Sequence, residues 1–411
     1  MASTTVIPQD ILQSNLQNMS KVERTRTWLQ SDVQSYAAGQ QVWFNVPQDY
    51  LVDCRRHFFS AQIALTAVGG TYAALPKPVT SIFSRIQLFF GATAVVDIQD
   101  LGVLQGILKT MNKYQPTINN IEDGWYTTAQ NKTQSILANQ YEFQFNLEAL
   151  QRIYPLQNIS QNMRICLTIN QTANTCYYDG TAPTLAITNF RFNYATIKPT
   201  SEVKAMVDGM CQAGNYQVKF WTYESQQTNI ASGTSASFDL SFKKSSVRGL
   251  ITAMRLSTTE TGGAVDHAFL LGYPENNISN AIVRLGSYNW PLNGYDYSAG
   301  PTKYGYMASA HDRRAFFNME FDSHDSQGDT FADCGSTAVA NAPNCFWVVY
   351  DMRRDTTFES YDNGFDCSKN SANFVEFINW TAGGGALTAH NYCMFAVTLT
   401  VQPGGGLIFQ Q

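Results

Sequence analysis

The chain has 411 residues, of which 44% are hydrophobic and 13% aromatic, so it carries enough apolar material for buried cores and does not have the composition of a disordered protein. Only 14% of the residues are charged, the formal net charge is −5, and no block of basic residues occurs, which argues against direct packaging of nucleic acid by this chain. The length predicts two or three domains.

The first 39 residues are predicted to form an N-terminal arm or helix outside the main body. Between Pro8 and Trp28, apolar side chains recur at helical spacing: Ile11, Leu12, Leu16 and Met19. The opening MASTTVIPQD lacks the charged and apolar regions of a signal peptide, and no apolar run in the chain is long enough for a spanning helix. We therefore expect synthesis in a reducing cytosol.

Short strands follow, recognised by alternation of apolar and polar residues. The clearest are VWFNV (42–46), EFQFNL (142–147), RICLTI (164–169), NFRFNY (189–194), SFDLSF (237–242) and FAVTLTV (395–401). A period of two indicates sheets with one buried face. Many such strands joined by polar, glycine-containing connections predict sandwiches or barrels rather than parallel α/β units.

Helical patterns are few. Val96 to Lys113 carries apolar residues at helical intervals and predicts an amphipathic helix. Glu202 to Met210 predicts a short helix with Ser201 as its N-cap. This second helix falls in residues 197–213, which we expect to link two larger units.

The order of elements repeats along the chain. Ser81 to Met111 reads as a strand, a turn at Gly91 and a helix, and Asn280 to Ala310 reads as a strand, a glycine turn and a short helix-like run. We interpret this as a tandem duplication, with Ile86 and Ile282 as buried strand residues in the two copies. Two unrelated all-β domains with similar patterning are the alternative.

The predicted fold is therefore all-β: two tandem eight-stranded jelly-roll β-sandwiches with a few short helices. The first sandwich is expected over residues 40–196 and the second over 214–402, followed by a tail over 403–411. Glycine triplets at 383–385 and 404–406 lack the Lys-Ser/Thr of a phosphate loop, and turn roles are expected for both.

Eight cysteines occur, none in a C-x-x-C pair, and several lie in apolar strands. We expect reduced, buried thiols and no zinc site. Residues that could titrate or bind metal were considered for catalysis: His57, His311 beside Asp312, His324 beside Asp325, and the cluster Asp322, Asp325, Asp329 and Asp333.

None of these residues predicts a catalytic, cofactor or metal site. Sequence neighbours on a strand point to opposite faces, no nucleophile or H-E-x-x-H motif accompanies the histidines, and the Asp cluster lacks the calcium-loop spacing. His57 is expected to be packed or solvated, and residues 322–333 are expected to form a solvated acidic loop. Aromatics that are expected to be exposed, and that could stack sugars or anchor subunit interfaces, are Trp125, Tyr126, Tyr177, Tyr178, Trp290, Tyr295 and Tyr297.

Four stretches together resemble the double jelly-roll major capsid proteins of icosahedral DNA viruses, the lineage of tailless membrane-containing phages, adenoviruses, virophages and Polinton-like viruses. They are FSRIQLFFGATAVVDIQDLGVLQGIL (83–108), ITNFRFNYATIKPTSEVKAM (187–206), SFDLSFKKSSVRGLITAMRL (237–256) and YCMFAVTLTVQPGGGLIFQ (392–410). The resemblance covers most of residues 40–411. Residues 114–139 and 311–344 fit poorly and are interpreted as variable loops.

The resemblance implies a non-enzymatic structural subunit of a virion, made in the host cell interior and without cofactors, that forms homotrimeric pseudo-hexagonal capsomers. Implied partners are neighbouring capsomers, penton or minor capsid proteins and an internal membrane, without direct sequence-specific nucleic-acid binding. The alternatives are a jelly-roll coat protein of a single-stranded RNA virus and a carbohydrate-binding or hydrolytic β-sandwich protein. The missing basic arm disfavours the first, and the missing secretion signal and paired carboxylates disfavour the second.

Overall fold

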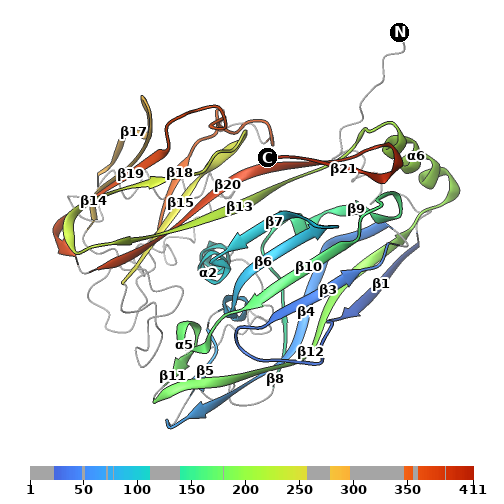
Figure 1. Ribbon diagram of the computed structural model, residues 1–411, viewed down its shortest axis with the longest axis horizontal. Helices are drawn as coiled ribbons and strands as arrows, with labels where there is room; N and C mark the ends of the chain where they lie inside the picture. Colours follow the sequence, from blue (N-terminus) through green and yellow to red (C-terminus); the bar gives the residue numbers. More distant parts are fainter. Residues whose placement is uncertain are drawn as a thin grey trace, which may run out of the picture.

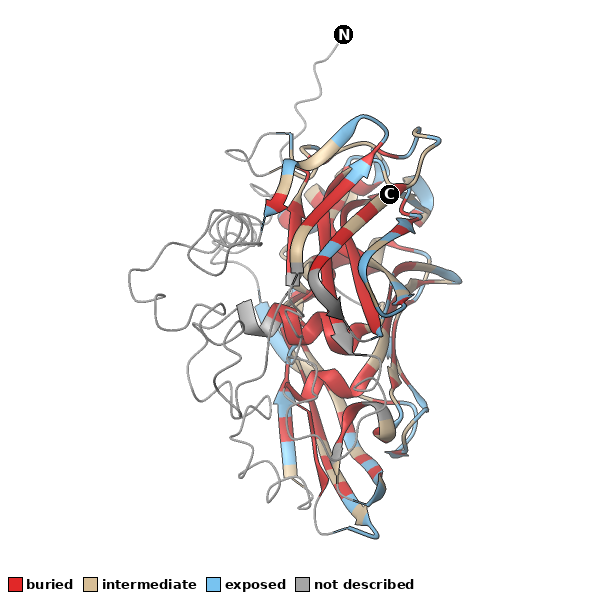
Figure 2. Ribbon diagram, turned by 90° about the vertical axis from the view of Figure 1, so that its left-hand side faces the viewer, coloured by how far each residue is buried: buried red, intermediate tan, exposed pale blue. Residues whose placement is uncertain are grey.

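The computed structural model describes residues 23–48, 51–70, 73–76, 78–111, 139–178, 180–256, 278–296, 347–354, 360–384 and 386–411. These residues form two β-sandwiches that lie beside each other and are joined by a helix (Figure 1). The two halves contain buried side chains along most of their strands (Figure 2).

The first sandwich is built from two sheets. One has the strand order β1-β12-β4-β8 and the other the order β3-β10-β6-β7. The main strands are β1 (Glu23–Gln30), β3 (Gln41–Val46), β4 (Leu51–Val68), β6 (Phe83–Phe90), β7 (Thr93–Gln99), β8 (Asn139–Phe143), β10 (Met163–Ile169) and β12 (Thr181–Lys198). Shorter elements are β2 (Ser35–Tyr36), β5 (Ala73–Ala74), η1 (Val79–Ile82), α2 (Leu101–Met111), η2 (Glu148–Gln151), β9 (Ile153–Pro155), η3 (Leu156–Asn158), α5 (Thr172–Thr175) and β11 (Tyr177–Tyr178).

The second sandwich repeats this arrangement. Its sheets have the orders β13-β20-β15-β18 and β14-β19-β16-β17. The strands are β13 (Tyr216–Ile230), β14 (Gly233–Leu240), β15 (Val247–Leu256), β16 (Ile278–Leu285), β17 (Tyr288–Asp296), β18 (Trp347–Asp351), β19 (Phe374–Gly384) and β20 (Leu387–Val401). Helix α6 (Ser201–Gln212) precedes it, and η6 (Pro403–Gly405) and β21 (Leu407–Gln410) follow it.

The two strand orders are the same when the main strands of each sandwich are counted from its first strand. In each, the first strand pairs with the last, the last with the third, and the third with the sixth, while the second, seventh, fourth and fifth form the facing sheet. This is the jelly-roll order, and it occurs once in each half. The predicted pair of tandem jelly-roll sandwiches is therefore confirmed.

Phenylalanines fill the core of the first sandwich, as the alternating strands predict. Phe59 lies with its ring centroid 4.9 Å from that of Phe192 and 5.3 Å from that of Phe145. Phe44 adds an edge-on contact with Phe190 at 5.3 Å. Since offset and edge-on ring pairs add stability beyond area burial, this cluster ties strands of both sheets together.

The N-terminal prediction is wrong for the residues that the structure describes. Glu23–Gln30 is not helical but forms β1, which pairs antiparallel with β12 from Glu23↔Lys198 to Gln30↔Arg191. The strand ERTRTWLQ is largely exposed and has no apolar alternation, so its sequence carried no period-two signal. The first sandwich thus spans 23–198 rather than 40–196; residues 1–22 lie outside the described part.

The repeated pattern that was predicted as a strand, a glycine turn and a helix is a β-hairpin in both copies. Thr93–Gln99 is strand β7, paired with β6, and α2 begins only at Leu101 instead of Val96. In the second copy Tyr288–Asp296 is likewise strand β17. Both hairpins turn at a glycine with φ of 60°, Gly91 and Gly286, a backbone conformation that favours glycine in such turns.

The hairpins also fix which residues are equivalent. Leu88 and Val283 stand at the same distance before their turn glycines, and both belong to the buried core. Ile86 and Ile282 are both buried, as predicted, but Ile282 is not the counterpart of Ile86: it pairs with Phe377, while its neighbour Val283 pairs with Glu376 on the core-facing side. A shift of one residue moves a side chain to the other face of the sheet.

Three smaller predictions changed at segment ends. Helix α6 begins at Ser201 after Thr200, which occupies the N-cap position without a side-chain hydrogen bond. The tail is ordered in part, since β21 pairs with the end of β20. The strand predicted over 142–147 ends at Phe143.

Six cysteines are free and buried, as predicted: Cys54, Cys166, Cys176, Cys211, Cys367 and Cys393. Cys334 and Cys345 lie outside the described residues. In the described part of the chain, no helix is long and apolar enough to cross a membrane.

Candidate functional site: the contact between the two sandwiches

The residues considered for catalysis do not form a site in the described structure. His57 is buried, and its Nδ1 lies 2.9 Å from the carbonyl oxygen of Cys54, as expected for a packed histidine. His311, His324 and the Asp cluster at 322–333 lie outside the described residues. Within the described ranges, no group of His, Cys, Asp and Glu is arranged to hold a metal ion.

The aromatic candidates whose side chains the structure describes are packed against other residues. Tyr295 is buried and its hydroxyl donates to the carbonyl oxygen of Val349 over 2.9 Å, so its prediction as an exposed aromatic is wrong. Trp290 packs edge-on against Phe365 with ring centroids 5.0 Å apart. Tyr178 packs against the core. Trp125, Tyr126 and Tyr297 lie outside the described residues, as does the side chain of Tyr177.

The most developed polar arrangement that the described residues show is the contact between the sandwiches, which no sequence pattern had indicated. Helix η2 of the first sandwich lies against β13 of the second. A carboxylate oxygen of Glu148 accepts the backbone N–H of Trp221 over 2.7 Å, and the guanidinium of Arg152 donates to the carbonyl oxygen of Lys219 over 2.9 Å. Glu148 and Arg152 also form an ion pair of 3.0 Å, so each holds the other in place.

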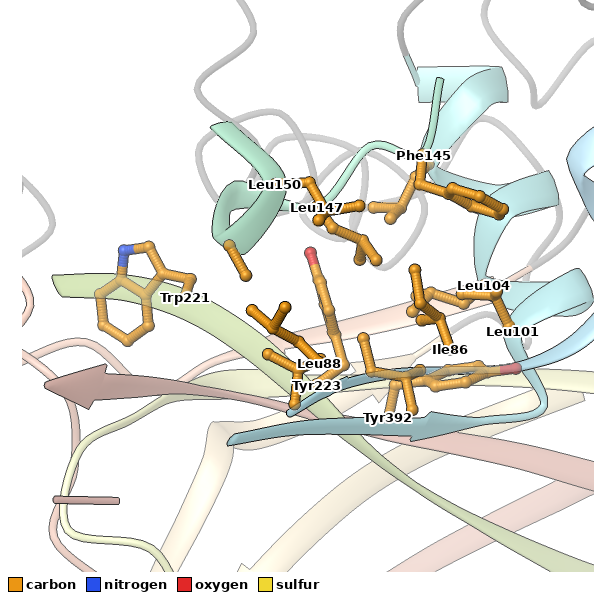
Figure 3. Packing of buried hydrophobic residues seen from close by; sticks show 14 of the residues in the cluster. Ile86, Leu88, Leu101, Leu104, Phe145, Leu147, Leu150, Trp221, Tyr223 and Tyr392 are labelled. Carbon is orange, nitrogen blue, oxygen red and sulfur yellow. The ribbon is translucent and has the colours of Figure 1, made fainter. Parts of the chain in front are cut away.

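Aromatic residues of the second sandwich complete this contact. Tyr361 donates its hydroxyl to Glu148 over 3.3 Å and is also hydrogen-bonded by Arg152, whose guanidinium lies 5.7 Å from the Tyr361 ring centroid. The Tyr361 ring lies 5.4 Å from Trp221. In Figure 3, Tyr223 of β13 lies among Leu88, Leu147 and Leu150 of the first sandwich, and these residues belong to one buried cluster, so the core of one sandwich continues into the other.

A second polar contact centres on Asp100, between β7 and α2. Its carboxylate pairs with Nδ1 of buried His390 on β20 and accepts the hydroxyl of Tyr392 over 3.0 Å. Asp100 adopts φ of 54°, a left-handed conformation that Asp tolerates better than most residues. Burial alone would raise the pKa of Asp100, but the charge and hydrogen bond of His390, with hydrogen bonds from Gln227 and Tyr392, hold it below its usual value.

A third contact lies near α6. The carbonyl oxygen of Gly405 in η6 accepts the backbone N–H of Ser160 over 2.9 Å and its hydroxyl over 3.0 Å. A Cβ at Gly405 would come within 2.8 Å of the Ser160 nitrogen, so glycine is needed for this approach. Asn158 donates to Asp208 of α6 over 2.6 Å. The second glycine triplet is thus a docking turn.

We expect Asp100→Ala to destabilise the chain by about 2 to 4 kcal/mol, because it removes the carboxylate that pairs with buried His390 and accepts from Tyr392. Urea unfolding at neutral pH measures this. Since the Asp100 pKa is lowered on folding, the wild-type advantage should be complete above that group's usual pKa of 3.8 and fade as the pH falls through the folded value. The exposed Asp362→Ala is the control. Equal unfolding curves for the two variants would contradict the assignment.

The comparisons with known proteins agree with this architecture. No sequence-family description and no curated protein matches the chain. Among solved structures, it is similar to the PBCV-1 virus capsid, with a TM-score of 0.60 at 10% identity, covering 96% of this chain and 98% of that one. The Faustovirus major capsid protein follows with a TM-score of 0.56 at 8% identity, covering 97% and 92% of the two chains.

The chain has the double jelly-roll fold. The Sputnik virophage structure is also similar, with a TM-score of 0.52 at 11% identity over 94% of this chain and 88% of that one. Because each similarity covers both sandwiches, the pair is matched as a unit. The double jelly roll is thus the level at which the sequence resemblance is confirmed.

Proposed function

We propose that this protein is a major capsid protein, a structural subunit rather than an enzyme, that forms trimeric pseudo-hexagonal capsomers tiling an icosahedral shell. The observation that carries the proposal is the presence of two jelly rolls with the same strand order in one chain, held together by side-chain contacts. Three such chains around a threefold axis supply six similar sandwiches, which suits a hexagonal lattice.

The two ends of the strands differ in a way that supports this role. Helix α6, the start of β1 and the end of β20 lie at one end, as the pairings Glu23↔Lys198 and Tyr216↔Val401 indicate. The three longest internal stretches outside the described structure, 112–138, 257–277 and 297–346, connect to strand ends on the opposite side. In the proposed shell, the α6 end faces inward and the opposite end faces outward.

The same proposal assigns the partners and the location. The subunit acts in the virion, contacts copies of itself, and meets penton or minor capsid proteins where the lattice changes. An internal membrane would lie on the α6 side, where the chain before Glu23 enters the fold. The low charged fraction of 14% supports extensive protein contacts, because such surfaces repel one another weakly.

Light scattering of the purified full chain in mild buffer at high protein concentration tests the self-association that the proposal requires. A mass corresponding to three chains of 45.8 kDa is expected. A mass of one chain at every concentration would contradict the proposal.

A further inference from the structure

Glu376 is a carboxyl in the centre of the second jelly roll. It lies on β19, is 0% exposed, and faces the opposite sheet of the sandwich. One carboxyl oxygen lies 2.7 Å from the hydroxyl oxygen of Thr252 on β15, and the other lies 2.7 Å from the hydroxyl oxygen of Tyr350 on β18. These contacts cross from one sheet to the other.

The network continues from Thr252 to Asn391. The Thr252 hydroxyl oxygen lies 2.9 Å from Oδ1 of Asn391 on β20, and Nδ2 of Asn391 donates to the carbonyl oxygen of Gln226 over 3.3 Å. A carbonyl oxygen only accepts hydrogen bonds, so Gln226 fixes the orientation of the Asn391 amide. Oδ1 of Asn391 therefore faces Thr252 and accepts a hydrogen bond from its hydroxyl group.

The hydrogen bonds of this network need one proton more than its hydroxyl groups supply. The network has three short oxygen–oxygen contacts: Tyr350 to Glu376, Glu376 to Thr252, and Thr252 to Asn391. The two hydroxyl groups supply two protons. If Thr252 donates to Asn391, the contact between Thr252 and Glu376 has no proton unless the carboxyl brings one. A protonated Glu376 satisfies all three contacts.

We propose that Glu376 is protonated in the folded chain and acts as a pH-sensitive element, whose ionisation as the pH rises through neutral breaks the hydrogen-bond chain between the two sheets of the second jelly roll. This inference concerns the chain itself and does not depend on the capsid role. Burial raises the pKa of Glu376 to about 7; the hydrogen bonds that Tyr350 and Thr252 would donate to an ionised carboxylate oppose part of this shift.

The surroundings of Glu376 supply no compensating charge within the described residues. Its partners in register on the neighbouring strands are apolar, Phe238 on β14 and Val283 on β16. The facing sheet contributes Thr252, Tyr350 and Asn391, and β17 of the same sheet as Glu376 contributes the phenol of Tyr295, whose hydroxyl donates to a backbone carbonyl. An ionised carboxylate there would be buried without a cation.

The first jelly roll shows that the fold does not require this carboxyl. Leu88 occupies the position of Val283 in the equivalent hairpin, and the partner of Leu88 in register is Ile165. Ile165 is fully buried and apolar where the second roll has Glu376. The pH sensitivity is therefore specific to the second roll.

The sign of the pH effect follows from the raised pKa. Folding increases the affinity of Glu376 for its proton, so its contribution is undiminished below its usual value of 4.5 and is lost as the pH rises from there through about 7. Glu376→Gln removes this dependence while keeping the network, because its amide donates to Thr252 and its carbonyl accepts from Tyr350.

The test compares thermal unfolding of the full chain, Glu376→Gln and the exposed control Glu142→Gln between about pH 5 and pH 9. As the pH rises over this range, the unfolding midpoints of the wild-type chain and of Glu142→Gln should fall by about 5 °C or more relative to the midpoint of Glu376→Gln. Parallel profiles for all three proteins would overturn the proposal.

Infrared spectroscopy of the wild-type chain gives a readout that needs no stable variant. At about pH 6, between the usual and the folded pKa, a buried protonated carboxyl should give a C=O band that fades as the pH is raised to about 9. The absence of such a band at about pH 6 would also overturn the proposal. Where Glu376→Gln folds, its spectrum should lack this band.

Discussion

Leu88→Asp and Val283→Asp are each expected to prevent stable folding of the jelly roll that carries them. Leu88 is 2% exposed and Val283 0% exposed, and both face the core at the same place in the two copies. A carboxylate there has no partner, and the loss should exceed about 3 kcal/mol, a large part of the stability of a domain. Soluble yield and urea unfolding followed by circular dichroism measure the effect.

The neighbouring residue provides the control. Ile282 lies on the other face of β16, in register with Phe377. The guanidinium carbon of Arg284 lies 4.8 Å from the ring centroid of Phe377. Ile282→Asp should therefore be milder than Val283→Asp. Leu88→Ala and Val283→Ala should fold with a loss of about 1 to 4 kcal/mol and so remain measurable. If Ile282→Asp lowered the stability more than Val283→Asp did, the assigned register would be wrong.

Glu148→Ala is expected to loosen the contact between the jelly rolls while leaving each roll folded. The change removes the acceptor of the Trp221 N–H and the ion-pair partner of Arg152, a loss of about 2 to 3 kcal/mol. Because a lattice subunit needs its two rolls in a fixed orientation, trimer formation should fall more than circular dichroism or yield. Analytical ultracentrifugation at several concentrations measures the trimer fraction.

The exposed carboxylate of Glu142, on β8 of the same roll, gives the matched control Glu142→Ala. Tyr361→Phe removes one hydroxyl from the same cluster and should produce a smaller effect in the same direction. If Glu148→Ala assembles like the Glu142→Ala control, the contact has no role in orienting the rolls.

The sequence predicted the strands that bury one face and expose the other. Strands β3, β10 and β12 alternate clearly, and the repeated strand order followed from such segments. Strand β1 was missed because an edge strand rich in charged residues pairs through its backbone and shows little apolar pattern. Val96 and Ile98 fit a helix as well as a strand, so the start of α2 was misplaced.

The contact between the two jelly rolls could not be predicted from the sequence, for a different reason. Glu148 and Trp221 meet only because two folded sandwiches pack together, and no local pattern records that. Glu376 did leave a signal: in FVEFINW it stands in phase with buried Phe374 and Ile378, where a strand with one apolar face has no reason to place a carboxyl. A charged residue in phase with the core marks a position worth examining.

Electron microscopy of the purified full chain tests the central claim most directly. The account predicts triangular or hexagonal particles, each built from three chains with two jelly rolls apiece, and their association into lattices or shells at high concentration. Single two-lobed particles under all conditions, with no capsomers, lattices or shells, would contradict it.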